Sequence, residues 1–210
     1  MPEMHDFMDV RNEIMEDDDA AIVARCRQGD TEAFAFLVRR HQKKMLNVVY
    51  RMIGNYDEAC DIVQEGFLST YRAIGKFRGD AQFSTWLCGI MMNHARTHLQ
   101  QRALHLRRTA LSLDDPVKSK DGGLSAETSS QEASVVEKIE KHQLAAKVQE
   151  CIGQLDGEQR EVIVLRDIQG FSYDDIGATL KIPPGTVRSR LFRARQELKE
   201  RLLQAVGDLI

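Results

Sequence analysis

Apolar side chains recur along most of this chain at the three- and four-residue spacings of amphipathic helices, and strand-type alternation is absent. After Asp30, an expected N-cap, one such stripe runs for more than twenty residues. Its apolar positions are Phe34, Leu37, Val38, Met45, Val48, Val49 and Met52. The pattern predicts an all-α fold.

Two further helices are expected to follow this stripe. A break at Gly54 and Asn55 precedes a helix over about residues 57–74. The polar stretch 75–82 is expected to be a loop. A third helix should then run from Phe83 to about residue 102, with Ser84 as its N-cap.

The composition changes between about residues 110 and 134, where small, polar and charged residues dominate and Asp-Asp-Pro and Gly-Gly breaks occur. Such a stretch is typical of a flexible linker between two small helical domains. We therefore predict an acidic disordered tail, a first helical domain, a flexible linker and a second helical domain, over residues 1–17, 18–108, 109–134 and 135–210.

The second domain carries the pattern of a helix-turn-helix. A short amphipathic helix is expected after Ser172, its expected N-cap, and the turn Pro-Pro-Gly at 183–185 opens a longer helix. The longer helix has an apolar stripe, made of Val187, Leu191, Ala194, Leu198 and Leu202. A different face, near the N-terminus of this helix, carries Arg188, Ser189, Phe192 and Arg193, where a recognition helix presents side chains to bases.

Charge is distributed unevenly along the chain. The formal net charge is −3, yet residues 181–201 hold seven basic and two acidic residues, while residues 1–20 hold eight acidic residues and one arginine. A local basic surface attracts a polyanion whatever the total charge. The alternative is a solvated helix face with i,i+4 ion pairs, although arginines outnumber the acidic residues there.

The composition and the N-terminal sequence also indicate where in the cell the protein is expected to be. Hydrophobic residues make up 42% of the chain, enough for a real core, and no apolar run is long enough to span a membrane. The acidic N-terminus lacks a basic-then-apolar leader, so a cytoplasmic location without membrane insertion is expected. Four scattered cysteines, without a Cys-x-x-Cys pair, are expected to be reduced thiols, mostly buried: Cys26, Cys60, Cys88 and Cys151.

Four segments in a fixed order resemble one bacterial family. Residues 57–67 (DEACDIVQEGF) and 77–87 (FRGDAQFSTWL) resemble sigma region two, and residues 170–177 (GFSYDDIG) and 184–191 (PGTVRSRL) resemble sigma region four. Together they resemble the extracytoplasmic-function (ECF) sigma factors of the sigma-E type. This resemblance implies a promoter-specificity subunit that acts with core RNA polymerase on promoter DNA, controlled by an anti-sigma factor in a stress response.

The resemblance implies a polymerase-binding surface on the second helix. The matching positions, which would contact the clamp helices of the beta-prime subunit, are Asp61, Gln64, Glu65 and Phe67. The second domain would contact the beta flap. From the spacing alone, the polar residues could equally form an ordinary solvated helix face.

The loop and helix at 77–102 resemble the element that opens DNA at the minus-ten site. Taking a base out of the stack costs a few kcal/mol, and aromatic and cationic groups suit the displaced strand. The candidate residues are Phe77, Arg78, Phe83, Trp86, Asn93 and Arg96. Core packing is the favoured alternative for Trp86 and is also strong for Phe83, so Asn93 and Arg96 are the better candidates for DNA contact.

In the second domain, the resemblance assigns recognition of the minus-thirty-five element to Arg188, Ser189, Phe192 and Arg193. Arginine can bond guanine in a bidentate manner, which gives sequence choice. Arg166 and Thr186 are expected to contact phosphates, which position the protein without reading sequence.

Two positions depart from the family pattern. Pro184 stands where a non-proline residue is common, and it should stiffen the turn. Gly177 stands where alanine is frequent, and it should weaken its helix slightly.

Three function classes follow from these features. The favoured class is a sigma factor, with no catalytic residue, no cofactor and no metal of its own. The second is a stand-alone helix-turn-helix regulator. The third is an enzyme built on His94 and His98, whose spacing could hold zinc; a DNA-facing basic surface is the better account of these histidines, and no nucleophile-base set accompanies them.

Overall fold

The computed structural model describes the backbone of residues 18–111 and 135–207. Side chains are described for residues 18–109 and 143–205. All secondary structure in the described residues is helical, which confirms the all-α prediction. The predicted acidic tail and linker lie outside the described residues, apart from the end of one helix at 109–111. No described helix combines the length and the apolar character needed to cross a membrane.

The first domain is a bundle in which local caps set the helix boundaries. Asp30 accepts a hydrogen bond from the Ala33 amide at 3.0 Å, as predicted for the N-cap. Gly54 ends that helix with φ +83°, and the Asn55 side chain caps the next helix by accepting from the Glu58 amide. The elements are α2 (Asp19–Arg27), α3 (Thr31–Ile53), α4 (Tyr56–Ala73), the 3-10 turn η1 (Ile74–Lys76) and α5 (Phe83–Leu111).

Two details of α5 differ from the prediction. The carbonyl of Gln82, outside the helix, accepts from the amides of Thr85 and Trp86, so Ser84 lies within the first turn and is not the N-cap. The helix also continues to Leu111, beyond the expected end near residue 102. No proline or glycine interrupts residues 102–111, and nothing local stops the helix there.

The second domain consists of α6 (Val135–Gly153), α7 (Gly157–Ile163), the π-helical turn η2 (Val164–Ile168), α8 (Tyr173–Leu180) and α9 (Pro184–Gly207). Ser172 caps α8 by accepting from the Asp175 amide at 3.1 Å, as predicted. Val187, Leu191 and Ala194 of the predicted α9 stripe are fully buried. The helix-turn-helix is therefore packed on the domain core through this stripe.

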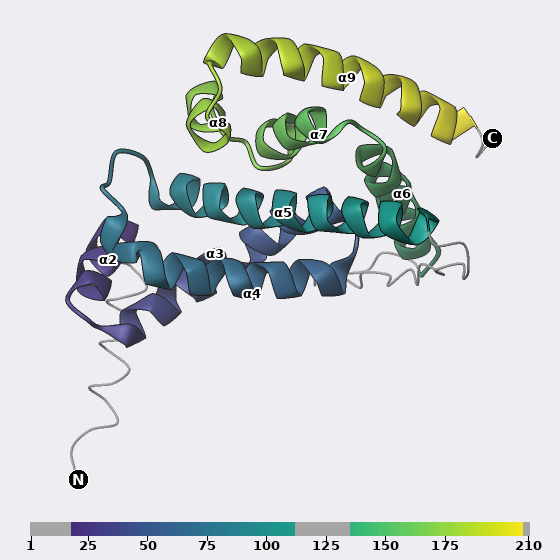
Figure 1. Cartoon of the computed structure of the whole chain (residues 1–210). Helices are drawn as coiled ribbons and strands as arrows, with labels where there is room; N and C mark the ends of the chain where they lie inside the picture. Colours follow the sequence, from purple (N-terminus) through teal and green to yellow (C-terminus); the bar gives the residue numbers. More distant parts are fainter. Residues whose placement is uncertain (1–17, 112–134, 208–210) are drawn as a thin grey trace.

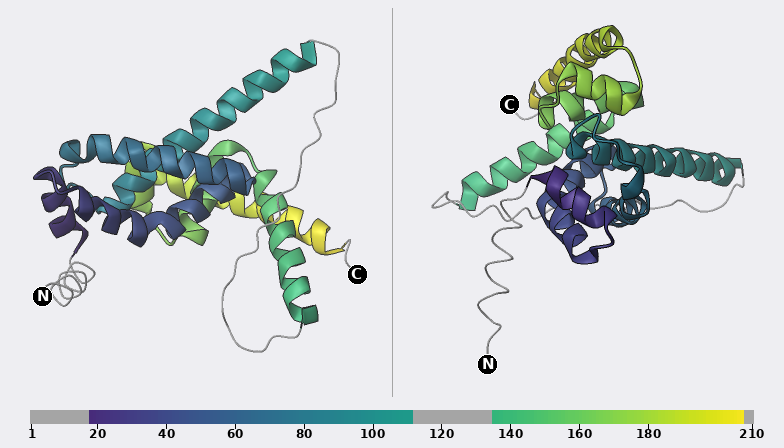
Figure 2. Two further views of the ribbon diagram at one scale, coloured as in Figure 1. Left: turned by 90° about the horizontal axis from the view of Figure 1, so that it is seen from below. Right: turned by 90° about the vertical axis from the view of Figure 1, so that its left-hand side faces the viewer.

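The two domains lie against each other. In Figure 1, α7 and α8 lie over α5, while α6 descends beside the end of the first domain; Figure 2 shows the same arrangement from two further sides. Buried apolar residues of both domains form one continuous cluster. Burying each large apolar side chain stabilises the fold by roughly 1.5–3 kcal/mol. Apolar packing therefore helps to hold the two domains together, in addition to the polar contacts between them that are described below.

Candidate DNA- and polymerase-binding surfaces

The face of α9 predicted to read DNA is open to solvent. Arg188, Ser189, Phe192 and Arg193 are all exposed, and Phe192 is 65% exposed despite its apolar ring. The tight turn before the helix is held by Lys181 in a left-handed conformation, φ +57°, and by bonds from the Thr186 and Val187 amides to the Pro183 carbonyl. An exposed aromatic beside cationic side chains suits contact with the thymine methyl and with base edges.

The arginines of α9 fall into two groups. Arg190, Arg195 and Arg201 form ion pairs within the second domain, with Glu158, Asp167 and Glu197 respectively. Arg188 and Arg193 make no ion pair with the residues that the structure describes. The ion-paired alternative therefore applies to Arg190, Arg195 and Arg201, whereas Arg188 and Arg193 stay available for an anionic partner.

The two residues predicted to contact phosphates, Arg166 and Thr186, are less exposed than the residues predicted to read bases. Arg166 donates to the Phe171 carbonyl at 2.7 Å and lies over the Tyr173 ring at 5.0 Å, so it braces the segment that leads into α8. Thr186 is half-buried in the first turn of α9. Arg166 thus has a structural role in this conformation, in addition to the predicted phosphate contact.

The predicted polymerase-binding residues of α4 divide by exposure. Asp61, Gln64 and Glu65 are exposed along one helix face. Phe67 is buried and meets the Phe34 ring edge-on, with centroids 6.5 Å apart, so it lies in the core and not on the exposed face of the helix. The apolar part of the exposed face is Leu68, 55% exposed, which follows Gln64 by four residues.

Tyr71 extends this face by one more turn and was missed in the sequence analysis. It is 43% exposed and stacks edge-on against Phe34 with centroids 5.1 Å apart. Its three-residue spacing from Leu68 was the available signal. We call Asp61, Gln64, Glu65, Leu68 and Tyr71 the α4 patch.

The aromatic residues near the predicted melting element form a cluster in the core. Phe77 and Phe83 are 8% and 3% exposed and contact each other edge-on at 5.7 Å; Trp86 lies 5.1 Å from Phe77 and is half-buried. Stacking a displaced base on Phe77 or Phe83 would require this cluster to open. The burial of Phe83 fits the core alternative given for it, and Phe77, for which no such alternative was given, is buried in the same cluster. Arg78, beside them in the loop, is exposed and 3.7 Å from Asp80.

Asn93 and Arg96 have different surroundings on α5. Asn93 is exposed, and its Oδ1 lies 3.4 Å from Nη1 of Arg96. The Arg96 guanidinium is half-buried and engages both carboxylate oxygens of Glu161 on α7, one of them at 2.7 Å. The hydrogen bond from Arg96 to Glu161 raises the pKa of Arg96 against the opposing effect of burial.

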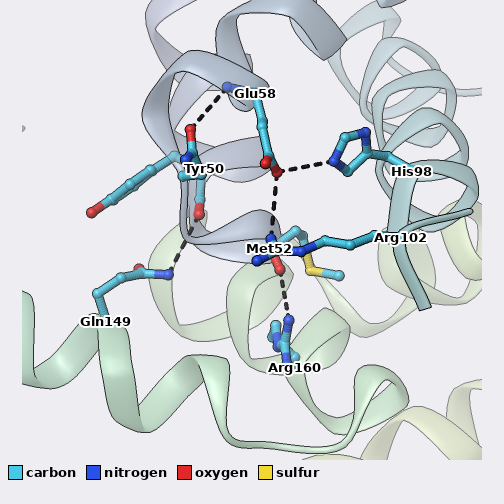
Figure 3. A network of polar contacts seen from close by, with 8 residues as sticks. Tyr50, Met52, Glu58, His98, Arg102, Gln149 and Arg160 are labelled. Atoms are coloured by element: carbon cyan, nitrogen blue, oxygen red, sulfur yellow. Dashed lines mark hydrogen bonds and ion pairs between the residues drawn. The ribbon is translucent and has the colours of Figure 1, made fainter. Parts of the chain in front are cut away.

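Two histidines of α5, His94 and His98, contact α4. His94 lies 3.0 Å from the Ser69 hydroxyl, and His98 lies 2.9 Å from a carboxylate oxygen of Glu58 (Figure 3). Within the described residues, no group of three or more His, Cys, Asp or Glu side chains is arranged to hold a metal ion. The two histidines therefore fasten α5 to α4 at separate points.

The end of α3 is capped by residues of the second domain, which sequence analysis did not predict. Gln149 of α6 donates to the carbonyls of Tyr50 and Arg51, and Arg160 of α7 donates to the Met52 carbonyl at 2.7 Å (Figure 3). The last carbonyls of a helix lack partners within it. Long-range contacts of this kind leave no local signal in the sequence.

These surfaces define a class of protein: a helical DNA-binding protein with an exposed helix-turn-helix and a separate patch suited to a protein partner. The family model for Sigma-70 region 2 matches residues 37–104, and the model for Sigma-70 region 4 matches residues 145–198. The chain belongs to the ECF RNA polymerase sigma factors, the family that these two matches and its relatives share. It is an alternative sigma factor, which acts with core RNA polymerase on promoter DNA.

The relatives cover nearly the whole chain. The RNA polymerase sigma-H factor of Pseudomonas aeruginosa is 36% identical over 189 residues, 90% of this chain and 96% of that protein. The ECF RNA polymerase sigma-E factor of Escherichia coli is 36% identical over 187 residues, 88% of this chain and 94% of that protein.

Two solved structures are similar along most of the chain. One is CnrH in complex with the cytosolic domain of CnrY, with a TM-score of 0.62 and 26% identity, covering 90% of this chain and 99% of that one. The other is the sigma factor RpoE of Bartonella quintana in complex with the anti-sigma factor NepR, with a TM-score of 0.63 and 22% identity, covering 82% and 98%. The second likeness concerns the fold.

Proposed function

We propose that this chain directs core RNA polymerase to promoters by reading a minus-thirty-five element with α9 and a minus-ten element with α5. The observation that carries the proposal is the exposed α9 face, where Arg188 and Arg193 lack acidic partners within the described structure while neighbouring arginines are ion-paired. A bidentate arginine contact discriminates between bases by about 1–3 kcal/mol.

The minus-ten contact is assigned to Asn93 and Arg96, with Arg78 and the half-buried Trp86 beside them. Asn93 offers hydrogen-bonding groups to a displaced base, and Arg96 offers charge to the strand. Phe77 and Phe83 hold this element in shape through their packing. Arg166 and Thr186 would anchor phosphates next to the upstream element.

Core polymerase would bind at two places. The α4 patch combines carboxylate, amide and apolar groups on one exposed face and fits the clamp helices of the beta-prime subunit. A shallow hollow of about 330 Å³ near the end of α9, lined by Leu198, Leu202 and Leu203 with the stems of Arg195 and Lys199, fits the beta flap. Nucleotidyl transfer belongs to the polymerase, and the chain itself is not an enzyme.

Control by an anti-sigma factor is the expected form of regulation, in a stress response and in the cytoplasm where the polymerase works. The support is the likeness to CnrH, which was solved with the cytosolic domain of CnrY. The α4 patch and the α9 hollow are exposed surfaces that such a partner would cover.

Run-off transcription with core polymerase on fragmented DNA from the host tests this proposal. We expect discrete start sites that require the chain and share two upstream elements at constant spacing. DNA binding by the chain alone, with no start sites added, would instead support the stand-alone helix-turn-helix regulator.

A further inference from the structure

One face of the N-terminal half of α5 points at the second domain. Thr85, Gly89, Asn93 and Arg96, which we call the α5 stripe, follow one another at spacings of four, four and three residues. Thr85 lies 3.3 Å from Asp175 of α8, and a Cβ at Gly89 would lie 4.0 Å from Thr179 of the same helix. The stripe ends at the Arg96 pair with Glu161. The second domain thus sits on the face that carries the proposed minus-ten contacts.

Glu161 engages the guanidinium of Arg96, the group that we assign to the DNA strand. Its side chain is 8% exposed, and both carboxylate oxygens accept from the guanidinium, the two-point geometry that arginine also makes with phosphate. A buried carboxylate is costly unless it is paired, so Glu161 depends on Arg96 in this arrangement. Arg96 cannot hold Glu161 and a strand at once.

Further polar contacts fix the second domain in this place. Gln149 and Arg160 donate to the last carbonyls of α3, and Arg51 donates to the Gln149 side chain at 2.9 Å. Lys44 of α3 lies over the Phe171 ring at 4.8 Å. The proposed upstream reader is not used in these contacts, because Arg188, Ser189, Phe192 and Arg193 remain exposed.

We propose that this packing is autoinhibitory: in the free chain the second domain packs on the α5 stripe at Thr85, Gly89 and Arg96, and Glu161 holds Arg96 in place of the promoter strand. The inference rests on the proposed minus-ten role of Asn93 and Arg96. Polymerase binding, which engages both domains at separate points, would favour the open form. The free chain is then a poor binder of single-stranded promoter DNA, since its apparent affinity falls with the fraction that is open.

The test uses the full chain and two opening variants. Glu161→Gln keeps the shape of the side chain and removes the charge that competes for Arg96. Gln149→Ala removes an amide whose described hydrogen bonds all go to α3. The matched control for both is Glu150→Gln, which removes an exposed carboxylate paired only with Lys147 among the described ion pairs.

Two quantities are measured for each variant: the radius of gyration by small-angle X-ray scattering, and the affinity for a fluorescent single strand carrying the downstream element of a promoter mapped by run-off transcription. Both opening variants should expand and should bind the strand roughly tenfold more tightly than wild type, which corresponds to about 1.4 kcal/mol. Glu150→Gln should match wild type. In the assembled holoenzyme, the strand affinity of all four proteins should be equal.

An Arg96→Ala holoenzyme separates the two ways of failing. Weaker strand binding by this holoenzyme, with both opening variants indistinguishable from wild type as free chains, would overturn autoinhibition and leave the minus-ten assignment standing. Unchanged strand binding by the Arg96→Ala holoenzyme would overturn the minus-ten role of Arg96, and the competition by Glu161 with it.

Discussion

Gly177 of α8 lies so close to the turn of the helix-turn-helix that a Cβ there would be 2.9 Å from the Ile182 carbonyl oxygen and 3.8 Å from the Pro184 ring. Helix propensity alone favours alanine over glycine by about 1 kcal/mol. The contact with the turn opposes that gain. The glycine that the sequence analysis expected to weaken α8 therefore makes room for the turn that presents α9.

Gly177→Ala should accordingly lower the free energy of unfolding by about 1–2 kcal/mol, because overpacking against backbone costs more than propensity returns. Chemical denaturation measures the change. Gly185→Ala is the control, since a Cβ at Gly185 meets nothing within 4 Å, and this variant should be neutral or more stable by up to about 1 kcal/mol. Equal stability of the two variants would contradict the close approach.

Asp19 fastens α2 to α3, and its contribution should depend on pH. Burial raises the pKa of the Asp19 carboxyl, but hydrogen bonds and charges from His41 and Arg40 outweigh burial and hold the pKa below its usual value. A depressed pKa stabilises the fold above the unfolded-state pKa, near 4, and this stability is lost as the pH falls through the folded-state value.

Asp19→Asn should therefore cost about 1 kcal/mol at neutral pH, and the difference from wild type should shrink below about pH 4. Urea unfolding across the acid range measures it. Asp18→Asn is the control, because the exposed Asp18 makes no side-chain capping bond, and it should change stability little at any pH. A constant difference between Asp19→Asn and wild type down to pH 3 would contradict the charge-based account.

The burial of Phe83 predicts that its size matters for stability rather than for stacking on bases. Phe83→Ala should destabilise the first domain by roughly 3–5 kcal/mol, whereas Phe83→Leu should cost about 1.5 kcal/mol or less and leave promoter melting nearly intact. Permanganate reactivity of unpaired thymines in the polymerase complex measures melting. A folded Phe83→Leu variant that binds promoters without melting them would show a direct role for the ring.

The α4 patch predicts a charge-sensitive affinity for core polymerase. Asp61→Lys should weaken binding to core roughly tenfold, about 1.4 kcal/mol, without changing thermal stability, because the side chain is exposed. Fluorescence anisotropy of the labelled chain, titrated with core, measures this. The same charge reversal at exposed Glu200 on α9 is the control. Equal loss at both positions would indicate a general charge effect.

Features set by neighbours in the sequence were predictable. Asp30 and Ser172 are N-caps because their side chains reach amides three residues ahead, and Val187, Leu191 and Ala194 of the α9 stripe are buried because their spacing matches the helix. The end of α5 was missed because residues 102–111 contain no breaker, and the π-helical turn at Val164–Ile168 has no sequence signature that we recognised.

Features set by distant residues were beyond the sequence. Arg96 meets a carboxylate 65 positions away, and Gln149 caps a helix end 98 positions away, so neither pairing has a local pattern. The exposure of neighbouring residues on α4 also depends on distant residues: Phe67 is buried against Phe34, whereas Leu68 is 55% exposed, although both are apolar. The sequence was therefore enough to name candidate residues of the binding surfaces, but not the distant residues of the same chain that those candidates contact.

The measurement that tests the central claim most directly combines Arg188→Ala with a scrambled minus-thirty-five element in run-off transcription. If α9 reads that element, Arg188→Ala lowers initiation roughly tenfold on the intact promoter, within the 1–3 kcal/mol of a bidentate contact, and changes it little on the scrambled one. Lys199→Ala, the same change of charge farther along α9, should not distinguish the two promoters. An equal loss from Arg188→Ala on both promoters would contradict sequence recognition by this helix.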